Sequence, residues 1–377
     1  MRATLSDSAL ARYAGRFVWL ELDFDKPVNQ PFMARHGVSA TPTLYVLDAA
    51  TDRATATHLG GLTLPALERF LDQGERAFRG GPKSPADAAL ARGDGLLGAG
   101  RPSEAAIAYR EALRLAAPAR PERLRALASL TWALSLGGAT QACAETAAAE
   151  APGMVRGETF GAVVLAGLAA ANQGGAAPWA EAPRKTLEPL AQEALGLPAI
   201  LRDHRFQLYQ QLMHSALARG DTAAVIRLGH RWLDEIEATH PRDDDERSAL
   251  DIARVDAASE IDEPQRVLPA LAASERAMPR NYNASLRLAQ MAAAAGRYDE
   301  SVTACERGLA HVTGPLGRSW LLRTKAEALA GRGDKVAARR ALEQALASAR
   351  AIGNPMNRAN NVRYLTREIA GLDPPAR

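Results

Sequence analysis

The fold class predicted by the sequence is an α/β module at the N-terminus followed by an all-α solenoid of helical repeats, with α-helix predominating overall. In the first 78 residues, apolar and polar side chains alternate in short runs that glycine and proline interrupt, which is typical of strands. From residue 86 onward, apolar side chains recur every three or four positions, which is typical of helices. A chain of 377 residues is also longer than one hydrophobic core usually holds. We therefore expect an N-terminal domain over residues 1–78, a linker over 79–85, helical repeats over 86–370 and a frayed tail over 371–377.

The N-terminal domain is predicted to contain three strands and two helices. The first strand would end at Lys26-Pro27, because proline cannot donate a hydrogen bond to a strand ladder. Asn29 is a suitable N-cap for a short helix, which His36-Gly37 would end. Thr63 is a suitable N-cap for the last helix, which carries leucine and phenylalanine on one face. The strands are expected at residues 18–24, where Val18, Leu20, Leu22 and Phe24 alternate with polar or aromatic residues, at 43–47 and at 54–59.

This order of elements, with the stretch RHGVSATPTLYVLD at residues 35–48, resembles the C-terminal two-thirds of a thioredoxin fold. In that family the matching proline follows a cis peptide bond and faces a redox-active Cys-x-x-Cys. The resemblance therefore implies a cis bond between Thr41 and Pro42, with the Thr41 backbone presented to an extended peptide. The chain itself has no Cys-x-x-Cys. Residues 1–16 resemble the C-terminal part of a helix whose N-terminal part is missing. A misassigned start, with the missing strand and cysteines encoded upstream, is favoured over a degenerate domain.

A recurring layout in the second part of the chain predicts repeats. Each of four turn glycines is followed five residues later by a small or β-branched residue and thirteen residues later by leucine, and the last two glycines are 37 residues apart. With the run GRYDE at residues 296–300, this layout resembles the tetratricopeptide repeat, although the large tryptophan expected early in each repeat is mostly missing. The glycines are Gly100, Gly220, Gly296 and Gly333, and the leucines are Leu113, Leu233, Leu309 and Leu346.

The resemblance to tetratricopeptide repeats also implies a binding face. In such repeats the first helix of each pair lines a surface that binds an extended or helical peptide. Counted from the turn glycines, that surface would carry Asn283, Leu286 and Gln290 from one repeat and Trp320, Arg323 and Glu327 from the next. The alternative is that these are ordinary helix positions without a binding role. Trp320 distinguishes the two, because it would be partly exposed in a binding groove and buried between helices in the alternative.

Composition and charge exclude several classes of function. The net charge is only +3, although the pI is about 9.0, and acidic and basic residues are interspersed. Aromatic residues make up 5% of the chain, which leaves few rings for base stacking, so we expect no nucleic-acid partner. No apolar run is long enough to span a membrane, and no signal peptide is visible. We therefore expect a soluble protein that is cytoplasmic as written, or exported if an upstream signal was clipped; the sequence predicts no oligomeric state.

The motifs that could carry chemistry have simpler structural explanations. Cys143 and Cys305 lie far apart in helical segments and are expected to be small buried residues. The G-x-G-x-x-G pattern at residues 93–98 follows a helical pattern, whereas a dinucleotide fingerprint requires a preceding strand. The acidic run at residues 243–245 lacks the spacing of a calcium loop and suits a helix start. We therefore predict no catalytic, cofactor-binding or metal-binding residue in this chain.

Taken together, these patterns favour an adaptor that binds a protein or peptide partner and carries out no redox chemistry. One alternative is a thiol-disulfide oxidoreductase whose Cys-x-x-Cys lies upstream of a misassigned start. Another is a helical scaffold with a vestigial N-terminal cap. The predicted peptide-binding residues are Thr41, Pro42, Asn283, Gln290, Trp320 and Arg323.

Overall fold

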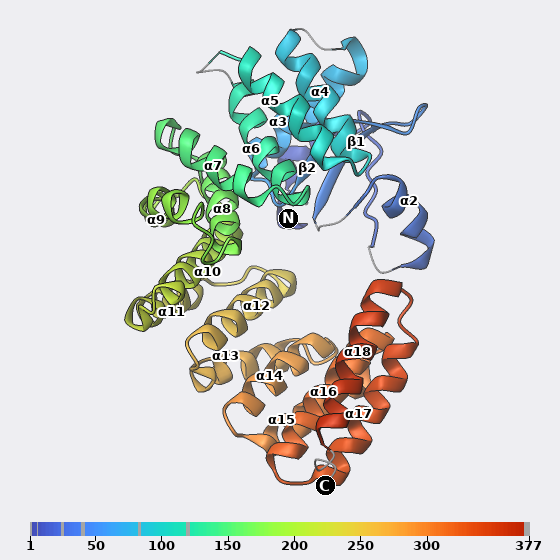
Figure 1. Ribbon diagram of the computed structural model, residues 1–377. Helices are drawn as coiled ribbons and strands as arrows, with labels where there is room; N and C mark the ends of the chain where they lie inside the picture. The colour runs from blue at the N-terminus through green and yellow to red at the C-terminus, as the bar shows by residue number, and fades with distance from the viewer. Residues whose placement is uncertain are drawn as a thin grey trace. The chain divides into compact units, whose positions relative to one another are not determined.

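The computed structural model describes residues 2–5, 7–23, 26–38, 42–81, 84–117 and 121–372. The chain is mostly α-helical, which confirms the prediction of a mainly helical protein (Figure 1). It divides into two compact units, residues 1–228 (unit 1) and 229–377 (unit 2), and each is described by itself.

Unit 1 begins with short elements around a two-stranded sheet. These are α1 (Arg2–Leu5), the 3-10 helices Ser8–Tyr13 and Pro27–Asn29, α2 (Gln30–Arg35), β1 (Thr43–Asp48), β2 (Arg53–Leu59) and α3 (Leu64–Gly80). The predicted strands at 43–47 and 54–59 and both predicted helices are thus confirmed. Thr63 caps α3 as expected, because its Oγ1 accepts a hydrogen bond from the Ala66 amide at 3.4 Å. Asn29 precedes α2 but makes no capping bond with its side chain, which instead donates to the Asp23 carbonyl at 2.9 Å.

The strand predicted at residues 18–24 is wrong. Residues 17–23 have no regular secondary structure, and Val18 and Leu20 are 89% and 79% exposed. In the described part of the chain the sheet has two strands, so this segment has no ladder to satisfy its backbone groups. Alternation alone cannot form a strand without a partner. The thioredoxin-like fold expected here is therefore not confirmed.

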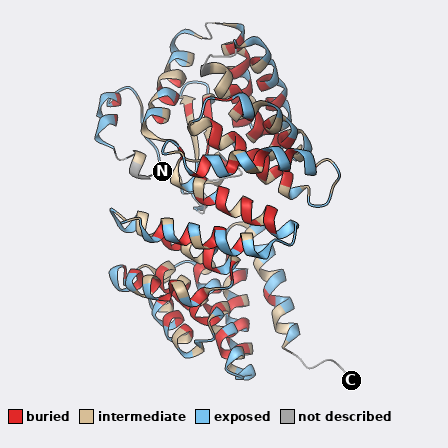
Figure 2. Cartoon of the chain, turned by 90° about the vertical axis from the view of Figure 1, so that its left-hand side faces the viewer, coloured by how far each residue is buried: buried red, intermediate tan, exposed pale blue. Residues whose placement is uncertain are grey.

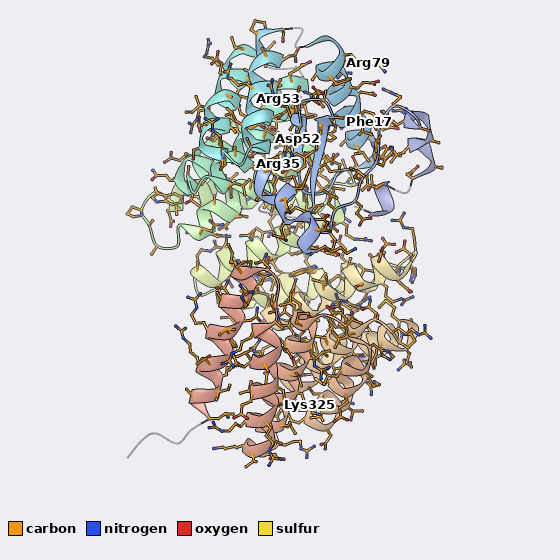
Figure 3. The ribbon with its side chains drawn as sticks, turned by 90° about the vertical axis from the view of Figure 1, so that its right-hand side faces the viewer. Phe17, Arg35, Asp52, Arg53, Arg79 and Lys325 are labelled. Atoms are coloured by element: carbon orange, nitrogen blue, oxygen red, sulfur yellow. The ribbon has the colours of Figure 1, made fainter. Side chains whose placement is uncertain are left out.

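The antiparallel sheet is packed on one face by α3 and the 3-10 helix Ser8–Tyr13. Their shared core contains Leu10, Tyr13, Val46, Ala56, Leu62, Leu67, Phe70 and Leu71. At one end of the sheet, Arg35 and His36 interact with Asp52 in the turn between the strands (Figure 3). The Arg35 guanidinium is the main reason why the pKa of the Asp52 carboxyl is lowered.

Unit 1 continues as antiparallel helix pairs, which are joined by tight turns except for the longer segment 174–180 in the last pair. The pairs are α4 (Pro85–Gly98) with α5 (Pro102–Leu115), α6 (Pro121–Leu136) with α7 (Thr140–Glu150) and α8 (Glu158–Gln173) with α9 (Glu181–Leu195), followed by α10 (Arg202–Ala218). The next helix, α11 (Thr222–Glu237), contains the boundary between the units. The first helices of successive pairs also pack on each other, α4 on α6, α6 on α8 and α8 on α10.

Unit 2 repeats the arrangement. Its helices are α12 (Asp244–Glu260), α13 (Pro264–Ala277), α14 (Tyr282–Ala294), α15 (Tyr298–His311), α16 (Pro315–Gly331), α17 (Lys335–Arg350) and α18 (Pro355–Gly371). Here too the first helices pack on each other, α12 on α14 and α14 on α16. Most of these helices are buried along one side and exposed along the other (Figure 2).

The turns between paired helices explain the repeat layout. All four predicted turn glycines have a positive φ, between 70° and 86°, which confirms their role. Gly138, Gly175 and Asp262 occupy equivalent turns with φ of 72°, 55° and 56°, and were not predicted. The residue five positions after each turn is buried, where one helix approaches the next: Ala105, Cys143, Ala180, Val225, Val267, Ser301 and Ala338.

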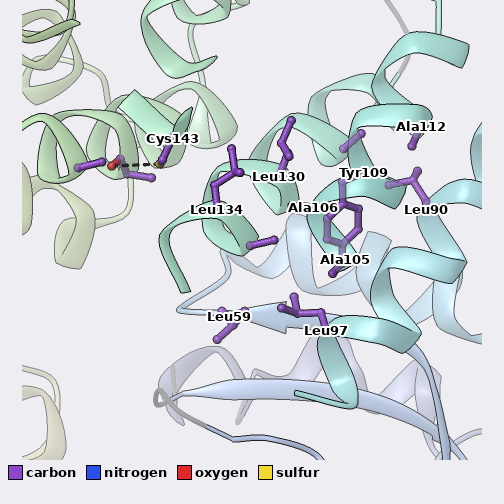
Figure 4. Close-up of a cluster of buried hydrophobic side chains, with 14 of the residues drawn as sticks. Leu59, Leu90, Leu97, Ala105, Ala106, Tyr109, Ala112, Leu130, Leu134 and Cys143 are labelled. Atoms are coloured by element: carbon purple, nitrogen blue, oxygen red, sulfur yellow. Dashed lines mark hydrogen bonds between the residues drawn. The ribbon is translucent and has the colours of Figure 1, made fainter. Parts of the chain in front are cut away.

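The sheet and the first helix pairs share a hydrophobic core. Leu59 of β2 packs into the same cluster as Leu97 of α4 and Leu130 and Leu134 of α6 (Figure 4). The segment predicted as a linker is short, because Arg79 and Gly80 are the last residues of α3. The domain boundaries drawn from the sequence stay a prediction.

Candidate functional site

The predicted peptide-binding residues of the repeats lie on α14 and α16 in unit 2. We call the surface formed by the outward side chains of α12, α14, α16 and α18 the first-helix face of unit 2. The first three helices are held side by side by direct packing, and Arg323 of α16 binds α18 through its side chain. Four helices thus contribute side chains to one surface.

On α14 the predicted residues differ in exposure, and their binding role stays a prediction. Asn283 and Gln290 are half-buried and keep part of their side chains at the surface. Leu286 is 5% exposed, so its predicted place on the binding face is wrong. Because α14 contacts α12, α15 and α16, most of its circumference is covered, and the apolar side chain turns into these contacts.

On α16 the three predicted residues have different environments. Trp320 is 38% exposed, which is unusual for so large an apolar side chain, and Glu327 is exposed. Arg323 lies one turn from each of them and is engaged with α18. Trp320 is therefore not buried between helices, as the alternative interpretation of this position required.

Arg323 is fixed by two side chains of α18. Its Nη2 donates to the Tyr364 hydroxyl at 2.6 Å, and its Nε lies 3.2 and 3.3 Å from the two carboxylate oxygens of Glu368. The guanidinium carbon also lies 4.3 Å from the centroid of the Tyr364 ring, a cation–π geometry. The arginine thus holds an aromatic ring and a carboxylate at the edge of the face.

The sequence missed Arg287, a partly buried cation on α14. Its Nη1 donates to the Ser248 hydroxyl of α12 at 2.9 Å. Burial lowers the pKa of Arg287, against the nearby charges of Asp251 and Asp256. Burial and the neighbouring Glu260 raise the pKa of Asp256. Asp262 forms the turn after α12, as the turn glycines do after α14 and α16. A repeat marked by this turn would have placed α12 on the same face, but an aspartate does not mark a turn as glycine does.

The second predicted peptide site is only partly described. Thr41 lies outside the described residues, so the geometry of the Thr41–Pro42 bond stays a prediction. Pro42 is exposed, and its carbonyl accepts a hydrogen bond from the Gly60 amide at 2.8 Å.

The cysteines are buried helix residues, as predicted. Burial raises the pKa of Cys143 and of Cys305 to about 12, so neither thiol is ionised near neutral pH. The Cys143 sulfur lies 3.3 Å from the Thr131 carbonyl and 3.6 Å from that of Ala166 (Figure 4).

Other motifs have structural roles in the described residues. The G-x-G-x-x-G run lies inside α4, and a Cβ at Gly93 would come within 2.5 Å of the Tyr109 ring. Asp243 caps α12, because its Oδ1 accepts from the Glu246 amide at 2.8 Å. Within the described ranges, no three His, Cys, Asp or Glu side chains are grouped so that they could hold a metal ion, and no helix is long and apolar enough to cross a membrane.

A charged depression of about 520 Å³ lies over α13, α14 and α15. Its lining includes Glu275 and Arg307, which form a two-pronged ion pair at 3.0 and 2.6 Å. Because these side chains satisfy each other across neighbouring repeats, the depression is explained as an inter-repeat contact.

Comparison with known proteins gives no family for this chain. No family model matches it, and no curated protein matches it. Among solved structures, a tetratricopeptide repeat protein from Parabacteroides merdae is 15% identical with a TM-score of 0.42, covering 75% of this chain and 99% of its own. The TPR2AB domain of yeast Sti1, solved in complex with pHSP90, is 15% identical with a TM-score of 0.30, covering 76% and 98%.

Proposed function

We propose that the protein is a tetratricopeptide-like adaptor that binds a protein or peptide on the first-helix face of unit 2 and performs no redox chemistry of its own. The observation that carries this proposal is the exposure of Trp320, 38%, at a predicted binding position. Tryptophan is enriched among the residues that dominate binding energies, because its large ring loses much water-exposed area on contact.

The surroundings of Trp320 suit a peptide. Asn283 and Gln290, on the adjacent helix, carry amides that can both donate to and accept from a peptide backbone. Arg323 is bound to α18 and orders the edge of the site rather than offering a free charge. One apolar anchor, with hydrogen-bonding amides on the adjacent helix, matches the way extended segments bind to helical surfaces.

The oxidoreductase alternative draws no support from the cysteines of this chain. Disulfide exchange needs an attacking thiolate, and both thiols have raised pKa values and buried sulfur atoms. A peptide site at Thr41 and Pro42 would be a second contact of the adaptor, and it rests on the resemblance of the flanking sequence alone.

The test is a peptide selection followed by a single substitution. Phage-displayed random peptides are selected on the immobilised full-length protein, and the dissociation constants of enriched peptides are measured by fluorescence anisotropy. We expect Trp320→Ala to weaken binding at least about tenfold, as for an interface residue worth more than about 1.4 kcal/mol. Because the ring is partly exposed, the melting temperature should fall by less than about 4 °C.

The matched control is Val336→Ala on α17, which removes an apolar side chain that is 64% exposed and lies on a second helix. It should leave peptide binding unchanged. Equal affinities for the two variants, or a large drop in melting temperature for Trp320→Ala alone, would refute the proposed site.

A further inference from the structure

The two helices at the centre of the first-helix face of unit 2 carry their predicted binding residues at matching levels. Asn283 of α14 and Trp320 of α16 each lie thirteen residues before the turn glycine of their repeat. Gln290 and Glu327 each lie six residues before it. Because α14 and α16 pack on each other, one level of the face holds Asn283 and Trp320 and the other holds Gln290 and Glu327.

A direct contact between the two helices supports this alignment. A Cβ at Gly317, one turn before Trp320, would come within 2.5 Å of the ring of Tyr282, which is next to Asn283. The two levels are seven helical residues apart, which corresponds to about 10 Å along the axis. About three residues of an extended peptide cover the same distance. A peptide that lies along the two helices can therefore contact both levels.

The charges on this face are balanced except at Glu327. Arg323 lies between the two levels, but Glu368 of α18 binds its guanidinium. Arg287 of α14 lies near the carboxylate of Asp256 on α12. Glu327 is exposed, and it forms no ion pair with any residue that the structure describes. The fold thus leaves one carboxylate of the face without a cation.

The neighbouring helix α18 does not supply that cation. The hydrogen bond with Glu368 and burial raise the pKa of the Tyr364 hydroxyl, and the charges of Glu368 and Glu327 add to this effect, whereas Arg323 opposes it. Two carboxylates and one guanidinium therefore act on this hydroxyl. A negative charge remains at the level of Glu327.

We propose that the peptide bound by this face is basic, with a lysine or arginine side chain beside Glu327, about three residues from the residue that covers Trp320. A cation at this position neutralises the unpaired carboxylate, whereas an acidic residue would be repelled where binding excludes water. The amides of Asn283 and Gln290 can hold the peptide backbone at the same two levels. This inference rests on the proposed function and adds the chemistry of the partner.

Parallel selections measure the preference for charge. One library of phage-displayed random peptides is selected on the immobilised full-length wild type, on Glu327→Lys and on Glu343→Lys. Glu343 is the matched control, because it is exposed on α17, a second helix, and undergoes the same change of charge. We expect lysine and arginine to be enriched on the wild type and on Glu343→Lys, and acidic residues on Glu327→Lys. The same composition in all three selections would overturn the proposal.

The enriched peptides then test the position of the charge. Each basic residue of a peptide is replaced singly by glutamate, and dissociation constants are measured by fluorescence anisotropy. One replacement should weaken binding to the wild type at least about fivefold, and Glu327→Lys should restore it. Added salt should weaken binding to the wild type more than to Glu327→Gln, because salt screens an exposed pair of charges. If Glu327→Lys restores no replaced peptide, the basic residue does not lie beside Glu327.

This inference and the proposed function fail in different ways. If Trp320→Ala weakens binding but the charge at position 327 has no effect, the site is right and only its preference for basic peptides is wrong. If Trp320→Ala leaves the binding of every enriched peptide unchanged, the site is wrong and this inference is refuted with it. The melting temperature of Glu327→Lys should stay close to that of the wild type, because Glu327 is exposed.

Discussion

At the scale of single residues, the glycines of α4 show why a motif must be interpreted in its structural context. Gly93 and Gly95 both lie inside the helix, but only Gly93 lies against a neighbouring side chain, the ring of Tyr109. That ring is buried, and its hydroxyl is fixed by Asp94, so it cannot move aside easily. The nearest atom to a Cβ at Gly95 is the Ala54 carbonyl oxygen, 3.9 Å away. Glycine is thus required for close packing at position 93, whereas no close contact requires it at position 95.

Alanine substitutions at these two glycines should act in opposite directions. Gly93→Ala should destabilise unit 1 by about 1–3 kcal/mol, because the added methyl group overpacks the Tyr109 contact. Gly95→Ala, the control, should stabilise the helix by up to about 1 kcal/mol, since glycine is a poor helix former. Urea unfolding followed by circular dichroism gives both values. Similar effects for the two variants would show that Gly93 is not a packing position.

At the scale of elements, the turns explain what could be predicted and what could not. Glycine at a positive φ is recognisable because other residues avoid that conformation, so the helix pairs around Gly296 and Gly333 followed from the sequence. Asp262 adopts φ of 56° with a side chain present, and nothing in its local sequence marks it. The strand expected at residues 18–24 failed for a different reason, because a strand depends on a neighbour that may be remote in sequence.

Substitutions at the turns should follow their backbone conformation. Gly296→Ala should cost about 1–2 kcal/mol, because φ of 74° brings the Cβ toward its own backbone although the surrounding space is empty. Asp262→Gly should change stability by less than about 1 kcal/mol, because glycine adopts the same turn freely. As a control, Gly371→Ala places a methyl group in open space without a positive φ and should not destabilise. Chemical denaturation of unit 2 measures these differences, and a neutral Gly296→Ala would contradict the argument.

At the scale of the whole molecule, the sequence predicted the succession of modules better than their contacts. Trp320 is exposed on α16 but its binding role stays a prediction, whereas Leu286 is buried and Arg287 was missed. The spacing of residues in the sequence determines which of them lie on one face of a helix. How much of that face is buried by neighbouring helices depends on the packing between repeats. The contact of Leu59 with α4 and α6 was equally unpredictable, because it joins segments from different modules.

The shared core predicts that damage in the sheet weakens the first helix pairs. Leu59→Ala should destabilise unit 1 by about 2–5 kcal/mol, because the residue is 7% exposed and packs among leucines of α4 and α6. Hydrogen-exchange protection should fall in these helices as well as in β2. Phe78→Ala, at a residue of α3 that is 57% exposed, is the control and should leave both helices unchanged. A loss confined to β2 would mean that the two modules fold separately.

The Glu158 carboxylate of α8 accepts hydrogen bonds from the Thr63 amide and hydroxyl, and this contact has a consequence for the order of events during synthesis. These residues are 95 positions apart, so at about 5–20 residues per second the ribosome needs roughly 5 to 20 seconds to produce the second after the first. During the earlier part of that interval, α6, which supplies Leu130 and Leu134 to the cluster around Leu59, has not yet been made. A nascent strand in this state is prone to pair with other chains. Slow codons between these positions, or a shortage of chaperones, should therefore lower the yield of this protein more than that of a helical array without the sheet.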